Sequence, residues 1–352
     1  PAAPGGRRSK MQVNKLALLG FGNAGQAFAR LLLDKEDEIR RKYGCQVKVS
    51  AIATNSRGNL EDDDGIDLEE ALSDIEREGK FCDTDRLSQM TTMEIVRKAD
   101  YDILIEMTPL NIFSGQPAIS HIEEAFARGK DVVTANKGPI AWRFSALKKM
   151  AEEKGCKFFY ETTVMDGTPV FNLVEKTLPL AKVTEVSGIL NSTTNFILEE
   201  MAKGSPYDDI ISRGKAMGFI EADPAMDIEG YDAAAKITAL LNVLMDADMT
   251  PDQVDRKGIE DITAEHIQKA AERGNVIKLL CSGRRSADGK VVARVRPEEV
   301  PAGDMLASVN STTSVVSITT DLMKKLSVVE HEPEIEQTAY GIFSDMLRAL
   351  SE

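Results

Sequence analysis

Histidine and cysteine are scarce in this chain of 352 residues, which has three histidines and four cysteines. Chemistry that needs a histidine base or several histidine ligands therefore has little to draw on. The cysteines form no C-x-x-C pair and lie far apart, at Cys45, Cys82, Cys156 and Cys281. This spacing argues against a zinc site and against a disulfide framework. We expect free thiols in a reducing, cytoplasmic compartment.

Positive charge and long apolar runs are lacking too. Lysine and arginine together number 43, against 57 acidic residues, for a formal net charge of −14. A nucleic-acid partner would require a basic face, so none is expected, nor is an anionic membrane surface. No apolar run approaches the roughly 18–20 residues of a membrane helix, and no signal-peptide h-region appears. Residues 1–10 predict a flexible leader, with Met11 as the native start.

The first half of the chain alternates short apolar strands with amphipathic helices. Residues 15–19 predict a strand, followed by the glycine turn GFGNAG, a helix that stops at Gly44, and a second strand at 46–54. Further strands are expected at 102–106, 131–134 and 156–160, and helices at 116–128 and 143–154. Such alternation is typical of a doubly wound parallel sheet.

The second half follows a different pattern. We expect helices at 170–178, 195–203, 206–217, 231–247, 263–273 and 338–350, and strands at 182–190, 275–282, 290–296, 305–309 and 314–320. The predicted fold is α/β, with a Rossmann domain over 11–160 to which 331–352 returns. A second α/β domain, catalytic and dimerising, is expected over 161–330.

The glycine turn predicts a dinucleotide site. A G-x-G-x-x-G between a strand and a helix lets the backbone approach a pyrophosphate at the helix N-terminus, although such a turn can also merely pack helix on sheet. The expected cofactor contacts here are Gly20, Phe21, Gly22, Asn23, Ala24 and Gly25.

The second strand ends without the carboxylate that usually binds the ribose of NAD. Ser56 and Arg57 follow it instead. An arginine can hold a 2′-phosphate, so we expect NADP to be preferred over NAD. The alternative is that Arg57 is a solvated loop charge.

Two lysines are candidates for acid/base chemistry. Lys236 lies four residues after Asp232, so the two share a helix face, either as a solvated ion pair or as a partly buried proton donor. Lys137 follows the strand at 131–134, and Thr108 ends a neighbouring strand at the same sheet edge, where ligands of such sheets bind. Lys137 is therefore expected near the nicotinamide, unless it is an exposed loop residue.

Four sequence blocks resemble the homoserine dehydrogenases. They are TANK (134–137), YETTVMDGTP (160–169), GILNSTTNFIL (188–198) and EADPAMDIEGYDAAAK (221–236). The resemblance covers most of 14–350. It implies NAD(P)-dependent interconversion of L-homoserine and L-aspartate 4-semialdehyde in threonine and methionine biosynthesis, by a homodimer.

The resemblance also implies roles for individual residues. Lys236 would be the acid/base residue, oriented by Asp232, with Lys137 beside both nicotinamide and substrate. Glu221 and Asp227 would bind substrate. A monovalent cation, usually sodium, would be bound by the loop that carries Glu161, Val164, Asp166 and Thr168.

The chain departs from the family pattern at three places. Met165-Asp166-Gly167 replaces a glycine-rich stretch, Ser192 replaces a glycine, and the glycine-rich segment before Thr338 is absent. The chain ends at residue 352, so we expect no C-terminal ACT-type regulatory domain and no threonine feedback. Two other functions stay open: a dehydrogenase of the same fold for a different small hydroxy or amino acid, and a non-catalytic NADP-binding sensor.

Overall fold

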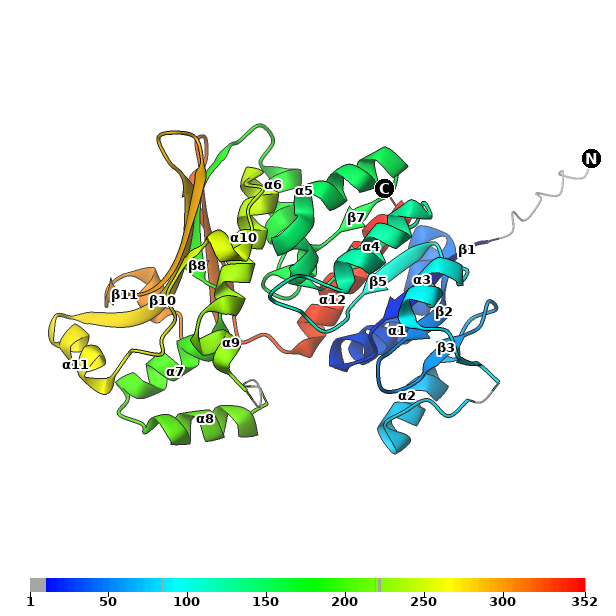
Figure 1. Cartoon of the computed structure of the whole chain (residues 1–352), viewed down its shortest axis with the longest axis horizontal. Coiled ribbons are helices and arrows are strands. Elements are labelled where there is room, and N and C mark those ends of the chain that lie inside the picture. Colours follow the sequence, from blue (N-terminus) through cyan, green and yellow to red (C-terminus); the bar gives the residue numbers. More distant parts are fainter. Residues whose placement is uncertain (1–10, 84, 219, 221–222, 352) are drawn as a thin grey trace, which may run out of the picture.

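The computed structural model describes residues 11–83, 85–218, 220 and 223–351, which form two sheets with helices around them (Figure 1). The first sheet has the order β4-β3-β2-β1-β5-β6-β7. Its strands are β1 (Gln12–Leu19), β2 (Cys45–Ala53), β3 (Asn59–Glu61), β4 (Leu87–Ser88), β5 (Ile103–Glu106), β6 (Asp131–Thr134) and β7 (Phe158–Phe159). The four pairings among β2, β1, β5, β6 and β7 are parallel, whereas β3 and β4 are antiparallel additions at one edge.

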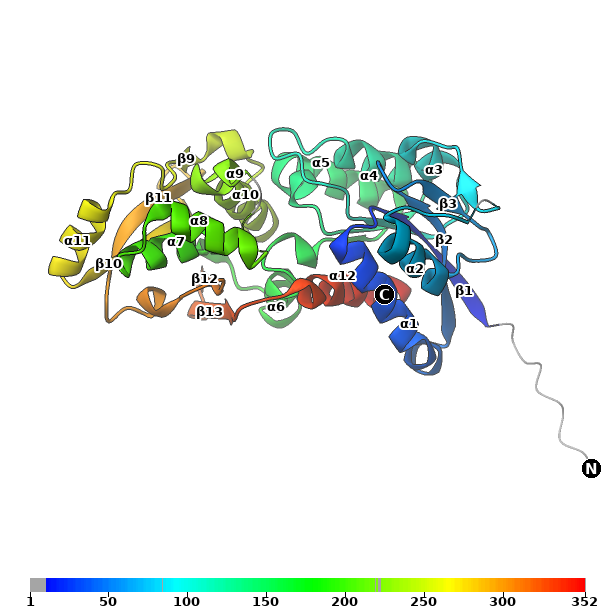
Figure 2. The same ribbon diagram turned by 90° about the horizontal axis from the view of Figure 1, so that it is seen from below.

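Helices cover both faces of this sheet, as the view in Figure 2 shows. One face carries α1 (Asn23–Tyr43), α2 (Leu68–Glu78) and the C-terminal α12 (Ile335–Ser351), and the other carries α3 (Thr92–Lys98), α4 (Ala118–Ala127) and α5 (Lys137–Lys154). Alternate residues of β1 explain the two layers. Leu16 and Leu18 enter one apolar cluster, and Ala17 and Leu19 enter the other. The predicted doubly wound parallel sheet is confirmed.

The second sheet has the order β13-β12-β8-β10-β11-β9 and is mainly antiparallel. Its strands are β8 (Val183–Ile189), β9 (Asp255–Arg256), β10 (Asn275–Arg285), β11 (Val291–Pro301), β12 (Ser314–Thr320) and β13 (Lys324–Glu330). The helices of this half are α6 (Val170–Thr177), α7 (Ser192–Ala202), α8 (Tyr207–Ala216), α9 (Ala225–Ile228), α10 (Tyr231–Met245) and α11 (Ala264–Glu272). The apolar helix α10 contributes many of its residues to the hydrophobic core of this half.

Several predicted elements differ from the structure. The strand expected at 305–309 is wrong: Met305–Ser308 form a 3₁₀ turn whose first N–H groups are capped by Asp304. Strand β13 and helix α3 were not predicted. Helix α5 begins at Lys137, six residues before its predicted start, and 143 is instead the position of a kink, because Arg143 has non-helical angles.

The C-terminal helix α12 returns to the first sheet and packs on α1. Ile342 and Met346 are fully buried between them. At its other end, α12 approaches the 161–169 loop so closely that a Cβ on Gly341 would lie 2.4 Å from Thr162 Oγ1. The last helix thus contacts both the first sheet and the loop that leads into the second. None of the described helices is both long enough and apolar enough to cross a membrane.

The packing of α12 can be tested at Met346. Met346→Ala would remove a fully buried side chain, so we expect the free energy of unfolding to fall by about 2–5 kcal/mol. Urea denaturation followed by circular dichroism measures it. On the same helix, Tyr340 is 58% exposed, and Tyr340→Ala should change stability by less than about 0.5 kcal/mol. Equal stability of the two variants would mean that α12 is not docked as described.

Candidate active site

A pocket of about 560 Å³ opens at the carboxyl edge of the first sheet, where ligands of such sheets bind. It extends from the glycine turn across the ends of β2 and β5 to the start of α4. Six of the predicted cofactor residues line it: Gly20, Phe21, Gly22, Ser56, Arg57 and Thr108. The structure therefore brings the glycine turn and the end of the second strand together at one cavity.

The glycine turn leaves room for a ligand. Gly20 has a positive φ of 98°, and a Cβ there would lie 2.4 Å from Met107 O, so no other residue fits. A Cβ on Gly22 would instead meet nothing within 4 Å. The first bond inside α1 runs from Gln26 N–H to Gly22 O, so the N–H groups of residues 23–25 have no carbonyl partner in the helix. Asn23, Ala24 and Gly25 do not line the pocket themselves, but these amides lie next to it.

Two buried nitrogen atoms in the pocket wall have no hydrogen-bond partner among the residues that the structure describes. They are Arg57 Nη1, after the second strand, and His121 Nδ1, on α4. Burial lowers the pKa of His121 to about 4, so its ring is neutral near pH 7. The Arg57 backbone is fixed by its N–H bond to Thr54 Oγ1, at 2.9 Å. Unpartnered donors beside open glycine backbone fit a polar, phosphate-bearing ligand such as a dinucleotide.

Asp232 lies between two lysines at the far end of this edge. Its carboxylate is 3.1 Å from Lys137 Nζ and 3.0 Å from Lys236 Nζ. Lys137 begins α5 and Lys236 lies on α10, so the pair of contacts joins the two halves of the fold. Burial opposes ionisation of Asp232, but the two ammonium groups outweigh it and hold its pKa below the ordinary value. Burial likewise disfavours a charged Lys236, but Asp232 outweighs it and raises the pKa of Lys236.

Asn191 links this cluster to the remaining predicted substrate residue. Its side-chain amide donates to Asp232 at 2.9 Å and to Asp227 at 2.6 Å, and its oxygen caps α7 by accepting from Thr194 N–H. Burial, and then the nearby charge of Asp232, raise the pKa of Asp227. Lys236 also donates to Leu190 O at 2.8 Å. The ends of β8 and α7 thus position both carboxylates.

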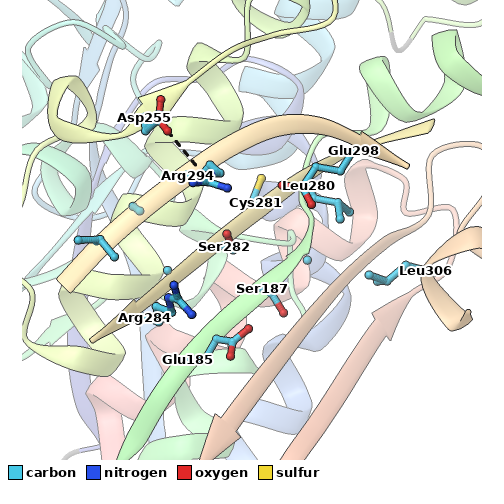
Figure 3. Close-up of a pocket in the computed structure, with 14 residues that line it drawn as sticks. Glu185, Ser187, Asp255, Leu280, Cys281, Ser282, Arg284, Arg294, Glu298 and Leu306 are labelled. Atoms are coloured by element: carbon cyan, nitrogen blue, oxygen red, sulfur yellow. Dashed lines mark ion pairs between the residues drawn. The ribbon is translucent and has the colours of Figure 1, made fainter. Parts of the chain in front are cut away.

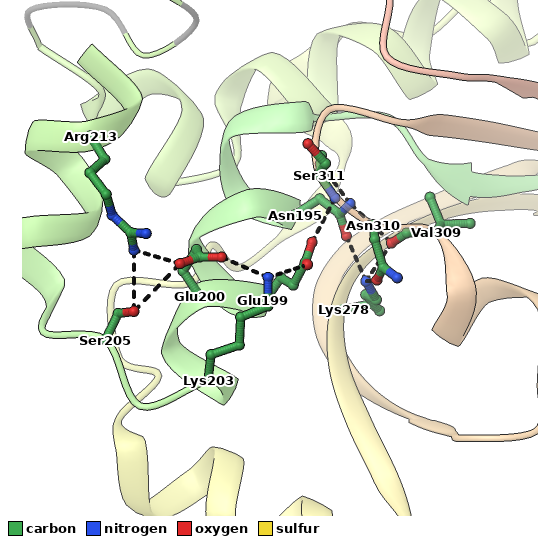
Figure 4. A network of polar contacts seen from close by, with 10 residues as sticks. All are labelled: Asn195, Glu199, Glu200, Lys203, Ser205, Arg213, Lys278, Val309, Asn310 and Ser311. Carbon is green, nitrogen blue, oxygen red and sulfur yellow. Dashed lines mark hydrogen bonds and ion pairs between the residues drawn. The ribbon is translucent and has the colours of Figure 1, made fainter. Parts of the chain in front are cut away.

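A second polar network holds α7 in place (Figure 4). The buried Lys278, on β10, donates to Asn195 Oδ1 at 2.9 Å and to Val309 O. Asn195 in turn donates to Val309 O and Ser311 O, and Glu199 accepts from Ser311 N–H. Burial lowers the pKa of Lys278 to about 8. Because α7 begins at Asn191, this network also fixes the polar link between Asp227 and Asp232.

Asn136 connects the lysine cluster to the cofactor pocket. Its oxygen caps α5 by accepting from Gly138 N–H at 3.0 Å, and its amide donates to Thr108 O at 3.1 Å. The cap fixes the start of the helix, and hence Lys137, against the loop that lines the pocket. A ligand that spans from the glycine turn past Thr108 would therefore meet the lysine pair.

The loop predicted to bind a cation lies between β7 and α6. The Glu161 carboxylate accepts the N–H groups of Phe171 and Asn172, at 2.7 and 2.8 Å, so its oxygens already have partners. Asp166 has a positive φ of 48° and accepts from Thr338 Oγ1 at 2.6 Å. Val164 is buried, and Thr168 N–H donates to Met165 O. Among the described side chains no group of three or more metal-ligating residues occurs, so a cation here would need backbone oxygens.

The sequence predicted much of this site but missed its polar connections. Glu221 lies outside the described residues. Asn136, Asn191 and His121 were not singled out, although the first two stand in the quoted blocks TANK and NSTTN. Their position directly before a helix is a capping signal that would have identified them. His121 offers no such local signal.

The comparisons with known proteins agree over most of the chain. A family model described as homoserine dehydrogenase matches residues 169–347, and one described as its NAD binding domain matches 20–161. A homoserine dehydrogenase of Methanocaldococcus jannaschii is 37% identical over 94% of this chain and 97% of its own length. An NAD(+)-dependent homoserine dehydrogenase of Pseudomonas canavaninivorans is 33% identical over 95% of each chain.

Solved structures give the same result. A homoserine dehydrogenase of Thiobacillus denitrificans has a TM-score of 0.80 at 29% identity and covers 97% of this chain, which spans 74% of that one. A hyperthermophilic archaeal homoserine dehydrogenase in complex with NADPH has a TM-score of 0.82 at 26% identity, over 96% of this chain and 98% of the other. Because the two family models match most of both halves and a relative is 37% identical over nearly the whole chain, the chain belongs to the homoserine dehydrogenases, a family of NAD(P)-binding oxidoreductases.

Proposed function

We propose that the chain interconverts L-homoserine and L-aspartate 4-semialdehyde, with NADP as the preferred cofactor and Lys236 as the acid/base residue. The observation that carries this proposal is Asp232, bound by Lys137 and Lys236 at the edge that also holds the glycine-turn pocket. Such an enzyme would serve threonine and methionine biosynthesis in the cytoplasm, with a small molecule as its partner.

The lysine pair suits the proton that accompanies hydride transfer. The nicotinamide cofactor, when bound, accepts or supplies the hydride. Lys236 has a raised pKa, so it is an ammonium that can donate a proton to the aldehyde oxygen during reduction. In the oxidation direction its neutral form takes the hydroxyl proton. In this proposal Asp232 orients Lys236, and the side chain of Lys137 lies beside the substrate and the nicotinamide.

Carboxylates in the same cluster suit an amino-acid substrate. Asp227, which accepts from Asn191, is proposed to bind the substrate ammonium group. Glu221 is proposed to bind the same group. The proposal also includes the division into a Rossmann part (11–160 with 331–352) and a catalytic and dimerising part (161–330).

The preference for NADP rests on the end of β2. In the described part of the chain, no acidic residue lines the pocket, whereas Ser56 and Arg57 do. Arg57 Nη1 is buried without a partner, as expected of a donor reserved for a 2′-phosphate. The other proposed cofactor contacts are the residues of the glycine turn, 20–25, with Thr108 and Lys137.

A monovalent cation, Na⁺, is proposed at the loop of Glu161, Val164, Asp166 and Thr168. Two non-glycine residues in this loop, Met165 and Asp166, have positive φ angles, which is a strained backbone held by its surroundings. Asp166 also contributes to the raised pKa of Lys236, so a charge bound at the loop would act on the acid/base residue.

Homodimerisation is proposed through the second sheet. Helices cover one face of this sheet, and a hollow of 510 Å³ lies on the other. Figure 3 shows the side chains that point into it, among them Glu185 on β8, Arg284 on β10 and Arg294 on β11. Charges of both signs on one face suit an isologous contact, in which a second copy related by a two-fold axis supplies the opposite charges.

The acid/base role can be tested with Lys236→Ala. We expect kcat for homoserine oxidation to fall by roughly 10²–10⁴-fold, because the proton acceptor is lost, while the Kd of NADPH changes little. Absorbance of the reduced nicotinamide gives the rate, and fluorescence titration gives the Kd.

Lys149 provides the matched control, since it is an exposed lysine on α5 and Lys149→Ala should retain full turnover. Near-normal turnover by Lys236→Ala would contradict the assignment. The wild-type enzyme must also oxidise homoserine faster than a panel of other small hydroxy amino acids, and a better substrate in that panel would overturn the proposed substrate.

The cofactor preference can be tested with Arg57→Ala. Loss of a charge-assisted contact to the 2′-phosphate should weaken NADPH binding by roughly tenfold to a hundredfold and leave NADH binding nearly unchanged. Arg30→Ala removes the same charge from an exposed position on α1 and should affect neither cofactor. Equal losses for both cofactors in Arg57→Ala would show that Arg57 does not bind the phosphate.

The dimer can be tested with Arg284→Glu. The wild-type protein should have the mass of a dimer by light scattering across a dilution series, and this charge reversal in the open face should shift the mass toward a monomer. Lys42→Glu makes the same change in charge on the exposed end of α1 and should leave the dimer intact. A monomeric mass for the active wild-type protein would refute the proposal.

A further inference from the structure

Glu106 is a fully buried carboxylate that no proposed step uses. It is the last residue of β5 and is 0% exposed. Its oxygens accept hydrogen bonds from Thr108 N–H at 3.0 Å, from the Thr108 hydroxyl, and from Thr134 Oγ1 at 3.1 Å. All of these donors are neutral. Within the described residues no ion pair joins Glu106 to a basic side chain.

The contrast with Asp232 is informative. Asp232 is also buried, but two ammonium groups balance its charge. A buried carboxylate with only neutral donors remains expensive to ionise, because hydrogen bonds replace only part of its lost hydration. Burial accordingly raises the pKa of Glu106 to about 7. The ionised form of Glu106 thus has no cation among the protein's own described side chains to balance its charge.

Glu106 lies where we expect the nicotinamide half of the cofactor to bind. Strand β5 lies next to β1, where the strand order reverses, and the glycine turn follows β1. Thr108 lines the pocket and donates its N–H to the Glu106 carboxylate. Asn136, which caps α5, donates to Thr108 O. A dinucleotide with its pyrophosphate at the glycine turn must cross these residues to reach Lys137. Its second ring would therefore lie over the end of β5.

We propose that Glu106 is a positioning residue whose carboxylate is the counter-charge of the oxidised nicotinamide ring, so that the site favours NADP⁺ over NADPH. This inference rests on the proposed function. The oxidised ring carries a positive charge and the reduced ring carries none, while the rest of the cofactor is the same. A buried carboxylate therefore attracts the two forms differently, and the low dielectric of the interior strengthens that difference.

The test is the affinity of Glu106→Gln for the two cofactor forms, measured by calorimetry. The amide keeps the size of the side chain and removes its charge. We expect the Kd of NADP⁺ to rise about tenfold, the factor equivalent to one pKa unit of interaction, and the Kd of NADPH to change by less than about twofold. A role limited to holding Thr108 in place would weaken both forms equally, and that result would overturn the proposal.

Asp345 offers a matched control. It is a fully buried carboxylate on α12 that accepts Glu161 N–H and lies 3.5 Å from Arg348 Nη1, and burial raises its pKa to about 7 as well. Asp345→Asn therefore removes a similar buried charge, and it should leave the ratio of the NADP⁺ and NADPH dissociation constants unchanged. A ratio that shifts equally in Asp345→Asn and Glu106→Gln would refute a specific role for Glu106.

The pH dependence of the wild-type protein tests the same point without relying on the folding of Glu106→Gln. As Glu106 ionises between about pH 6 and 8, the Kd ratio of NADP⁺ to NADPH should fall by up to about tenfold. The 2′-phosphate titrates in both forms and cancels from the ratio. Of the groups around the carboxyl, Thr108, Thr134 and Asn136 do not titrate in this range, and Asp345, on the packed helix α12, does.

The same titration on Asp345→Asn separates the two acids. Persistence of the pH-dependent ratio in that variant supports Glu106, whereas a ratio that becomes constant with pH assigns the effect to Asp345 and overturns the proposal. On the active-site helices, the lowered pKa of Asp232 and the raised pKa of Lys236 keep their charges constant over this range. Wild-type protein that binds no nicotinamide cofactor would instead refute the proposed function itself.

Discussion

The contact of one buried carboxylate with two ammonium groups holds the candidate active site together. Asp232 forms ion pairs with two lysines. Lys137 lies on helix α5, which packs on the first sheet, and Lys236 lies on α10, the same helix as Asp232. Removing either lysine leaves a buried negative charge with half its compensation, which is strongly unfavourable. The alignment of the two halves and the protonation of Lys236 therefore depend on the same few atoms.

The C-terminal helix supplies a second connection between the halves. Asp345 accepts the N–H of Glu161, and Thr338 donates to Asp166, so α12 holds both ends of the loop between β7 and α6. The segment before α12 lacks the family's glycines, yet Gly341 still lies against Gly167, where a side chain would collide. Close backbone approach at this one point places the strained loop beside the lysine cluster.

What could be predicted from the sequence was local in origin. The glycine turn, the helix after it and the i, i+4 pair of Asp232 and Lys236 each depend on residues close together in the chain, and the structure contains all of them. Strand β13 was missed because Lys324–Glu330 begins with two lysines and stays half-exposed at the sheet edge, which weakens any alternating pattern. The 305–309 segment resembled a strand by its apolar residues, but the capping side chain of Asp304 favours a turn.

Contacts between distant segments could not be predicted in this way. Asn191 meets Asp227 and Asp232 across 36 and 41 residues, and the sequence offers only the separate pieces. The same limit hid Glu106, which in the sequence is simply the polar end of an apolar strand. Only the fold shows that its neighbours are neutral whereas those of Asp232 are cationic.

Under the proposed function, this difference would give the two buried carboxylates separate roles. A carboxylate that is balanced within the protein, like Asp232, has a fixed charge and can orient a proton donor in every state of the reaction. A carboxylate without a cation, like Glu106, is ionised at a cost that a positively charged ligand can offset. An oxidoreductase whose cofactor changes charge by one unit in each turnover can use both kinds: one to keep the proton donor constant, and one to respond to the redox state of the ring.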